Sequence, residues 1–504
     1  MDGPFFMGID IGTYESKGVL TDGASNIVAS ASATHRMEIP LPGYAEHDAE
    51  KTWWADFCFL SNELITKSGA DPKHIEAVGC STIAPCCLPV DDDLKPLRKA
   101  ILYGVDVRAG NEIQYLENYY GADNIFKRCG TAVSSQSSAA KILWIKANEP
   151  DVYAKTARFT TGATYLTAKL TGNYVIDRYT AAAWVPIYDI KKEDWTDDLS
   201  LFCRRDQLAE CKWTHETAGT VTVSAARETG LKPGTPVVTG TADAAAEAIS
   251  VGVQHPGEMM LMYGSSIFII HVVDKFMSDA RIWSAPYLFP GTYALTAGMS
   301  TAGTLTRWFL EQFARDVAAE AEKNGKNPYA LLAEAASEIP PGSGGLIVLP
   351  YFSGERTPVN DPAAKGVIFG LNLSHTREHI YNACLEAIGY GVNQHFQIFD
   401  ELNAGTYKVM AVGGGTKNPK WLQIVSNICG KKQSVAEIET GAAYGDALLA
   451  GLGVKFYKSA DEMSRQIKIK HSVEPDMDTH NIYKKYAGNY AALYGATKHI
   501  MRDL

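Results

Sequence analysis

Several patterns that mark broad classes of protein are missing from this sequence. None of its nine cysteines belongs to a CxxC pair, and the cluster of Cys80, Cys86 and Cys87 lacks metal-ligand spacing and nearby histidines. We therefore expect reduced, structural thiols, as in a reducing cytoplasm. No apolar stretch is long enough to span a bilayer, and the first residues show no basic and apolar leader. Together these absences predict a cytoplasmic protein.

Clusters of charge are missing too. The net charge of −10 comes without an acidic tail or a basic run, whereas nucleic-acid binding requires clustered Lys and Arg. Apolar residues make up 46% of the chain and charged residues 21%, which is ordinary for a folded protein and argues against disorder. We expect small-molecule partners, with no nucleic acid and no membrane. A chain of 504 residues is long enough for two domains.

Strand patterns mixed with helical patterns predict an α/β fold. Three short strands with tight turns open the chain within residues 5–29. A strand–turn–strand pattern recurs at residues 258–272, as two related domains would give. The hinge-like segment 254–257 lies between them, so we place one domain at residues 1–253 and the other at 254–504. Helices are expected at 48–67, around 141–145, from 243, at 305–313 and at 377–399.

The first tight turn contains Asp10-Ile11-Gly12-Thr13. Glycine lets the backbone turn and leaves N–H groups free to bind phosphate oxygens, and the Thr13 hydroxyl adds a donor. Asp10, at the end of a strand, can hold Mg2+ directly or through water. Lys17 would add positive charge near the phosphates. A plain hairpin turn would use the same residues, so both interpretations stay open.

Two later turns rich in small residues are further candidates for phosphate or nucleotide binding. Gly264-Ser265-Ser266 joins two strands, where an ordinary β-turn is the alternative. Gly413-Gly414-Gly415 follows the strand at residues 408–412 and fits neither the GxGxxG nor the Walker pattern. It does allow a nucleotide's α-phosphate or ribose to approach the backbone closely. Asn418 starts the helix that follows, and Trp421 within it is expected in the core.

Asp243 is the candidate catalytic residue. It follows a strand and opens an alanine-rich run that is typical of a helix. An aspartate there is a good N-cap, which is the structural alternative. The helix dipole favours the ionised carboxylate by about 0.3–1 kcal/mol at an exposed site. An ionised carboxylate can accept a proton from a substrate hydroxyl as that oxygen attacks phosphorus.

Taken together, the motifs resemble the FGGY family of carbohydrate kinases. In chain order, the segments that carry the resemblance are residues 10–13, 138–145, 243–246, 366–386 and 413–415. The stretch 366–386 fits the family's C-terminal signature throughout, and Lys141–Ile145 resembles the N-terminal one. The resemblance implies two actin-like, ribonuclease-H-like domains with a central cleft that closes over ATP-Mg2+ and a sugar. Closure would expel water, which competes with the sugar hydroxyl.

The resemblance also assigns roles by position. The N-terminal domain would bind the sugar and carry the first phosphate loop, and the C-terminal domain would bind the nucleotide. Asp243 would be the general base and would lie at the sugar, and Asp10 would hold Mg2+. Phosphate contacts would come from Gly12, Thr13, Lys17, Gly264, Ser265 and Ser266, and nucleotide contacts from Gly413, Gly414 and Asn418.

Within the family, the chain resembles the xylulokinases most, from the lengths between motifs and from Tyr351–Pro358. One segment departs from them. The Gln-Met-His-Gly of their sugar pocket corresponds here to Ile83-Ala84-Pro85-Cys86, so a histidine and a glutamine that would bind sugar hydroxyls are absent. Asp106 and Arg108 resemble the family's sugar-binding Asp/Arg element, with a surface ion pair as the alternative. Residues 46–48 lie either near this pocket or in a structural role.

These features predict ATP-dependent phosphorylation of a hydroxyl of a small free sugar, with a ketopentose such as xylulose as the first candidate. Another substrate of the family, such as ribulose, gluconate, glycerol or erythritol, is the nearest alternative. An actin- or Hsp70-like ATPase, which needs no sugar-facing base, and a catalytically silent sugar-binding relative are alternatives of other classes. The sequence leaves the sugar, its hydroxyl and the assembly state open, with a homodimer as one option.

Overall fold

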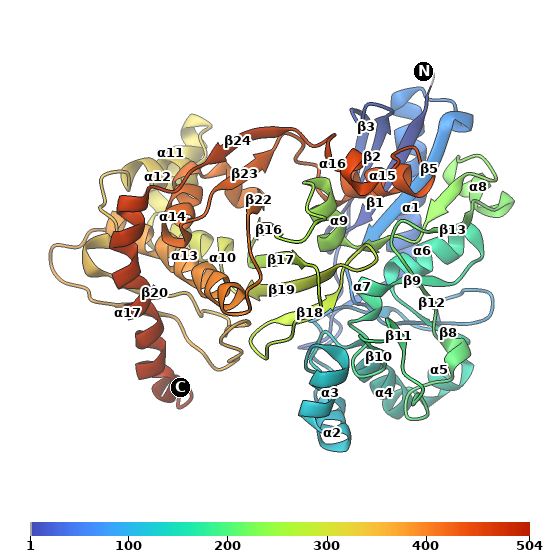
Figure 1. The fold of residues 1–504 in the computed structure, drawn as a ribbon, viewed down its shortest axis with the longest axis horizontal. Helices are drawn as coiled ribbons and strands as arrows, with labels where there is room; N and C mark the ends of the chain where they lie inside the picture. Colours follow the sequence, from blue (N-terminus) through green and yellow to red (C-terminus); the bar gives the residue numbers. More distant parts are fainter. Residues whose placement is uncertain (1–2) are drawn as a thin grey trace. The chain divides into compact units, whose positions relative to one another are not determined.

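The structure is a computed structural model that describes residues 3–504 (Figure 1). The chain forms two compact units, and each contains segments far apart in the sequence. The first unit holds the chain up to Pro256 together with Val272–Ala294 and Thr440–Lys468. The second holds Gly257–His271, Leu295–Glu439 and Ile469–Leu504. The domain boundary between residues 253 and 254 stays a prediction from the sequence.

The main sheet of the first unit has the strand order β13-β14-β5-β1-β2-β3, and β15 also pairs with β5. The opening strands β1, β2 and β3 are antiparallel neighbours, which confirms the predicted meander. Strand β5 runs parallel to β1, β14 and β15. These strands are β1 (Phe5–Ile11), β2 (Glu15–Asp22), β3 (Ile27–Thr34), β5 (Ile75–Thr82), β13 (Thr217–Thr220), β14 (Pro236–Val238) and β15 (Thr241–Ala242).

The register of these parallel strands brings polar residues together at one edge of the sheet. Asp10 of β1 lies opposite Ser81 of β5, and Ala242 of β15 lies opposite Thr82. Asp243 follows directly, as the first residue of α9 (Asp243–Ser250). Residues far apart in the sequence thus converge because the carboxyl ends of parallel strands meet at the same edge.

Helices pack on the central strands of this sheet. Helix α15 (Ala442–Gly453) contacts β1, β5 and α9, and α1 (Ala55–Ser68) contacts β1, β2 and β3 (Figure 1). Gly8 and Gly79 allow α15 to approach closely, since a Cβ would lie 1.9 Å from Ala443 O at Gly8 and 2.2 Å from Asp446 O at Gly79. Strand β1 is apolar along most of its length because helices cover it.

The helix predicted at residues 48–67 is confirmed with one difference in its first turns. Asp48 is the N-cap, as expected, but residues Ala49–Trp54 form a π-helical segment, η1, before α1 begins. The remaining elements of the first unit are β4 (Glu46–His47), η2 (Pro72–His74), β6 (Leu88–Val90), β7 (Ala100–Ile101), α2 (Gly110–Tyr120), α3 (Ala122–Cys129), α4 (Ser138–Asn148), α5 (Pro150–Lys155), β8 (Arg158–Thr160), α6 (Gly162–Thr171), β9 (Val175–Asp177), α7 (Arg178–Ala181), β10 (Tyr188–Asp189), β11 (Asp194–Trp195), η3 (Arg205–Gln207), β12 (Glu210–Lys212), α8 (Val223–Thr229), β18 (Trp283–Pro286) and α16 (Ala460–Ser464).

The second unit also has a mixed sheet, in which β19, β17, β16, β22, β23 and β24 lie side by side in this order. Strands β16 (Glu258–Tyr263) and β17 (Ile267–Val273) are antiparallel, which confirms the recurring strand–turn–strand pattern. Strand β22 (Lys408–Val412) runs parallel to β16. Helices α10 (Gly303–Phe313) and α13 (Arg377–Glu401) confirm the two that the sequence predicted here.

The other elements of this unit complete its layers. Helix α13 packs against α14 (Pro419–Cys429), and α17 (Met477–Met501) packs on both. The rest are β19 (Tyr293–Met299), α11 (Arg315–Asn324), α12 (Pro328–Ala335), η4 (Ser343–Gly345), β20 (Ile347–Leu349), β21 (Val367–Phe369), η5 (Gly414–Lys417), β23 (Gln433–Ala436) and β24 (Ile469–Val473). Between residues 3 and 504, none of the helices combines the length and apolar character that a membrane crossing requires.

Candidate active site

Carboxylates gather at the edge of the first sheet where β1, β5 and β15 end. Asp10 is the next-to-last residue of β1, Asp243 opens α9, and Glu247 follows one turn later in the same helix. All three are partly buried. Loss of water contact raises the pKa of Asp243 to about 6 and that of Glu247 to about 7. The pKa of Asp10 is also raised, first by burial and then by repulsion from Asp243 and Glu247.

Asp243 is the first residue of its helix rather than its cap. Ala242 takes the N-cap position, with extended backbone angles of φ −72° and ψ 147°. Oδ1 of Asp243 accepts a hydrogen bond from the Ala244 amide at 2.7 Å. This bond favours the ionised carboxylate and opposes the larger effect of burial on its pKa. A base with a pKa somewhat below neutral is mostly ionised at pH 7 and still accepts a proton readily.

Ser81 lies between two carboxylates. Its Oγ is 2.6 Å from Asp446 Oδ2 and 3.2 Å from Asp10 Oδ1. A serine hydroxyl has one hydrogen, so it can donate to one carboxylate only. The second contact therefore needs a protonated carboxyl group. Asp446 is fully buried, and burial raises its pKa well above the usual value, as it also does for Asp10. Both carboxyl groups therefore favour the protonated form that this second contact needs.

Sequence reasoning missed Ser81, Glu247 and Asp446. The signal for Asp446 is visible in hindsight, because it is the only charged residue in the helical run Ala442–Gly453. A lone charge inside an apolar helix is costly unless it has a partner, so it points to a buried polar contact. Nothing local in the sequence identifies Ser81 as that partner.

The turn between β1 and β2 has the geometry of a tight hairpin. The Gly12 amide donates to Glu15 O at 3.1 Å, and Thr13 Oγ1 lies 3.0 Å from the hydroxyl of Tyr103. Lys17 is half exposed, and its Nζ lies 3.3 Å from the Glu15 carboxylate. The charge of Lys17 lowers the pKa of Asp10 and of Glu247, so it acts on the acid cluster, although less than burial does.

The second unit contains a pocket of about 530 Å³. It lies between the β16–β17 turn, the start of α10 and the segment before α14. The turn is tied to α10, since the amides of Gly303 and Ala302 donate to Gly264 O and Ser265 O at 3.0 and 2.9 Å. The pocket is lined by Tyr263, Gly264, Ser265, Gly303, Thr304, Thr306, Arg307, Asn327, Tyr329, Ala330, Tyr381, Gly414, Gly415, Lys417, Asn418 and Trp421.

Four of the residues to which the resemblance assigned phosphate or nucleotide contacts line this pocket, namely Gly264, Ser265, Gly414 and Asn418. Ser266 and Gly413 do not line it. Gly413 shapes the segment instead, because its φ of +90° favours glycine and a Cβ there would lie 2.7 Å from Tyr263 O. At Gly415 a Cβ would lie 2.7 Å from the Trp421 ring.

Trp421 was expected in the core, and the structure shows it buried and also part of the pocket wall. The sequence did not identify the walls formed by α10 and by the segment around Tyr329. Their residues carry no recognisable motif and come together only through the packing of separate helices.

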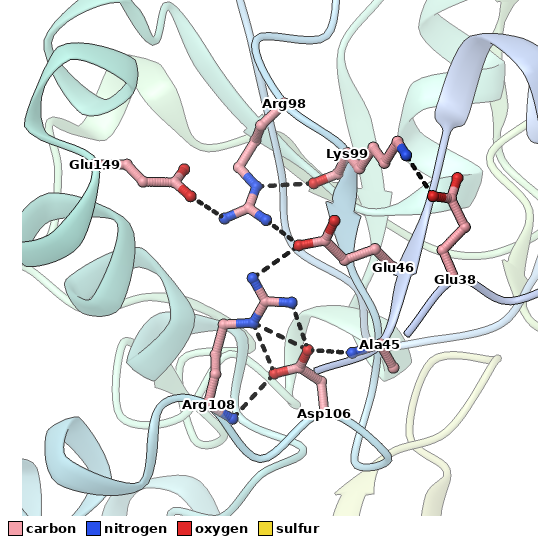
Figure 2. A network of polar contacts seen from close by, with 8 residues as sticks. All are labelled: Glu38, Ala45, Glu46, Arg98, Lys99, Asp106, Arg108 and Glu149. Carbon is pink, nitrogen blue, oxygen red and sulfur yellow. Dashed lines mark hydrogen bonds and ion pairs between the residues drawn. The ribbon is translucent and has the colours of Figure 1, made fainter. Parts of the chain in front are cut away.

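Asp106 and Arg108 form a buried ion pair within a larger network (Figure 2). Their side chains are 0% and 1% exposed, and the shortest contact between them is 2.7 Å. Asp106 also accepts from the Ala45 amide, and Arg108 contacts Glu46 at 2.9 Å. The guanidinium stacks 4.0 Å from the ring centre of Tyr44. These contacts satisfy both side chains within the protein, so a role in sugar binding stays a prediction without support from the geometry.

The neighbouring segment Ile83–Cys86 is mostly apolar and largely buried. Ile83 donates its amide to Ile11 O, and the Cys86 amide contacts Thr161 Oγ1 at 3.4 Å. Burial raises the pKa of Cys86 to about 12, which keeps the thiol protonated. This segment therefore offers no charged or amide side chain to a ligand.

Comparison with known proteins identifies the family. The sequence matches the N-terminal domain of the FGGY family of carbohydrate kinases at residues 5–250 and its C-terminal domain at residues 259–454. The chain belongs to the FGGY family of carbohydrate kinases. As an FGGY kinase it is a phosphotransferase that acts on a sugar, which confirms the enzyme class predicted from its motifs.

Relatives match nearly the whole length of this FGGY kinase. A xylulose kinase of Staphylococcus epidermidis is 28% identical over 99% of this chain and 98% of its own. A gluconokinase of Bacillus subtilis is 26% identical over 95% of this chain and 93% of its own. The solved xylulose kinase from Rhodospirillum rubrum has a TM-score of 0.92 and 29% identity, with 99% of each chain covered. This similarity confirms the two-domain α/β fold.

Proposed function

We propose that this FGGY kinase transfers the γ-phosphoryl group of ATP to a hydroxyl of a ketopentose such as xylulose, with Asp243 as general base. The observation that carries the proposal is the position of Asp243 at the helix start, with a pKa raised to about 6 beside Asp10. Phosphoryl transfer to an alcohol needs a group that accepts the hydroxyl proton as the oxygen attacks phosphorus. A carboxylate that is ionised at neutral pH meets this need.

The pocket of the second unit would hold the nucleotide. Its volume of about 530 Å³ lies within the range of small-molecule sites. Gly414 and Gly415 allow a ligand to approach the backbone, while Tyr381 and Trp421 offer aromatic surface to a base. Ser265 would contact phosphate oxygens through its amide and hydroxyl groups, and Gly264 would leave room for them, because its own amide donates to Ser266 O. In the first unit Thr13 would contact phosphate through its amide and hydroxyl groups, near the positive charge of Lys17, and Gly12 would leave room for the phosphate, because its own amide donates to Glu15 O.

Magnesium fits the acid cluster as a cofactor held mainly by substrate. Among residues 3–504 no group of three or more His, Cys, Asp or Glu side chains is arranged to hold a metal ion. Mg2+ commonly binds through one or two carboxylates together with phosphate oxygens and waters, so a complete protein cage is not required. Asp10 would supply that carboxylate, and bound Mg2+ would offset negative charge on the phosphates.

Xylulose is the first candidate substrate because several full-length relatives are xylulose kinases. Gluconate is the second candidate, since a gluconokinase matches the chain at a similar identity. The segment Ile83–Cys86 is apolar, so its side chains do not support the binding of several sugar hydroxyls by this segment.

A substrate panel tests the proposal. Xylulose, ribulose, gluconate, glycerol and erythritol would each be offered with ATP-Mg2+, and ADP release would be followed by a coupled assay. We expect the highest kcat/KM for xylulose. A higher kcat/KM for gluconate would make gluconate the substrate in place of xylulose, and the assignment as a sugar kinase would stand. If no sugar or polyol stimulated ADP release, the proposed function would be wrong.

A further inference from the structure

Two histidines hold the turn between β1 and β2 from one side. Nε2 of His35 lies 3.0 Å from Gly12 O, and Nε2 of His47 lies 3.1 Å from Thr13 O. The two rings are 5.1 Å apart and nearly perpendicular, at 88°. Consecutive carbonyl groups of the turn are thus each bound by an imidazole.

The hydrogen-bond partners of His47 fix its tautomer. The indole N–H of Trp53 can only donate, and it lies 3.1 Å from His47 Nδ1. Nδ1 is therefore the acceptor, and Nε2 carries the hydrogen that is donated to Thr13 O. This requires the neutral ring. In agreement, burial and the neighbouring His35 lower the pKa of His47 to about 4.

Both ring nitrogens of His35 face hydrogen-bond acceptors. Nδ1 lies 2.8 Å from Asp56 Oδ2, while Nε2 faces the carbonyl of Gly12. Both partners are acceptors, so both ring nitrogens donate, as they do in the imidazolium form. Ser16 Oγ donates to the same Asp56 oxygen at 2.7 Å and holds the carboxylate in place. The side chains of His35 and Asp56 are only 9% and 14% exposed, which strengthens the pair.

These bonds determine where the amides of the turn point. In a trans peptide the C=O and the N–H point in opposite directions. With Gly12 O bound to His35, the N–H of Thr13 is directed away from the histidines. With Thr13 O bound to His47, the N–H of Tyr14 is directed away as well. Successive amides held in this way form an anion-binding concavity.

We infer that His35 and His47 are positioning residues that fix the amide groups of the Gly12–Thr13 turn for an ATP phosphate. The inference rests on the proposed role of this turn in phosphate binding. Neither histidine touches the phosphate in this arrangement. Each acts through a carbonyl, and the contact with Asp56 holds the ring of His35 in place behind the turn.

The test compares replacements that keep or remove the donor. In His47→Gln the side-chain amide can still donate to Thr13 O and its oxygen can accept from Trp53, whereas His47→Leu can do neither. We expect His47→Leu to raise KM for ATP or lower kcat by on the order of tenfold. His47→Gln should stay within about threefold of wild type. KM for the sugar should change little in both.

His35 gives an independent test at the neighbouring carbonyl. His35→Leu should raise KM for ATP or lower kcat, as His47→Leu does. His35→Gln should recover part of this loss, because its side-chain amide can still donate to Gly12 O but does not carry the charge of an imidazolium. His471→Leu, an exposed histidine of β24, serves as the control. Thermal unfolding of each variant identifies any loss that comes from misfolding alone.

The inference would be overturned if folded His47→Leu and His35→Leu had wild-type KM for ATP and wild-type kcat. It would also be overturned if the Gln variants were as impaired as the Leu variants at unchanged melting temperature. A separate readout is binding of ATP-Mg2+ to the wild-type protein without sugar. If the wild-type protein does not bind ATP-Mg2+, the proposed function itself is contradicted. If the wild type turns over normally and the histidine variants have the same KM for ATP and the same kcat, only the inference is contradicted.

Discussion

Burial and hydrogen-bond partners together set the charge of each carboxylate at the edge of the first sheet. Asp243 accepts from a backbone amide at the start of α9, which favours its ionised form. Asp446 faces a serine hydroxyl that is shared with Asp10, and it is fully buried. Burial without a charged partner favours a neutral acid. Asp243 is therefore suited to accept a proton, and Asp446 is suited to position its neighbours.

The pH profile of catalysis should follow the ionisation of Asp243. A general base works in its deprotonated form, and the pKa of this carboxyl is about 6 in the free protein. We expect kcat/KM to fall roughly tenfold per pH unit below about pH 6 and to level off above it. Initial rates between pH 5 and 8 check this. A profile that stays flat down to pH 5 would exclude Asp243 as the titrating base.

Substitutions at Asp446 should reveal its protonation state. A protonated Asp446 donates to Ser81 Oγ, and the amide of Asn can replace that donor. Asp446→Asn should therefore melt close to the wild type, while Asp446→Ala should lose about 1–3 kcal/mol of unfolding free energy because a buried partner is left unpaired. Chemical denaturation measures both. If Asp446→Asn were as unstable as Asp446→Ala, Asp446 would be ionised instead.

At the scale of elements, loops and short strands bring the ion-pair network together. Arg108 and Asp106 follow β7, and Glu46 lies in β4 (Figure 2). Tyr44, whose ring lies against the Arg108 guanidinium, precedes β4. The Arg108 guanidinium also lies over the ring of Trp144 in α4, with its Cζ 4.9 Å from the centre of that ring. The N-terminal signature that contains Trp144 thus has a structural contact in this chain.

Breaking this network should affect stability more than substrate binding. Arg108→Met leaves Asp106 buried without its cation and should cost about 3–5 kcal/mol. Urea unfolding measures the loss, and KM for sugar and for ATP should stay near wild type in the folded fraction. A large rise in KM for the sugar at unchanged stability would support instead the sugar-binding role predicted from the sequence.

The pocket of the second unit depends on a glycine between two aromatic residues. In Gly415→Ala the new methyl group would lie 2.7 Å from the Trp421 ring and from Tyr263 Cβ, so these walls must shift. We expect KM for ATP to rise several-fold with little change in KM for the sugar. Gly488→Ala in α17 meets nothing within 4 Å and serves as the control. Equal KM values for ATP in both variants would place the nucleotide elsewhere.

For the whole molecule, local sequence patterns predicted several strands and helices but not their long-range packing. The β1–β3 meander and the strand pair around Gly264 were predictable because alternation and turn residues act over a few positions. The contact between Ser81 and Asp446 spans 365 positions. No local pattern shows that the segment 440–468 belongs to the first unit. The pocket walls were missed for the same reason.

The central claim is that Asp243 accepts the sugar proton during phosphoryl transfer. The most direct measurement is the rate of γ-phosphate transfer to sugar by Asp243→Asn, with folding checked by thermal unfolding and ATP binding measured separately. We predict a loss of about a hundredfold to ten-thousandfold in kcat, the range that a missing general base typically costs, with normal folding and ATP binding. Transfer at a rate near that of the wild type would contradict the claim.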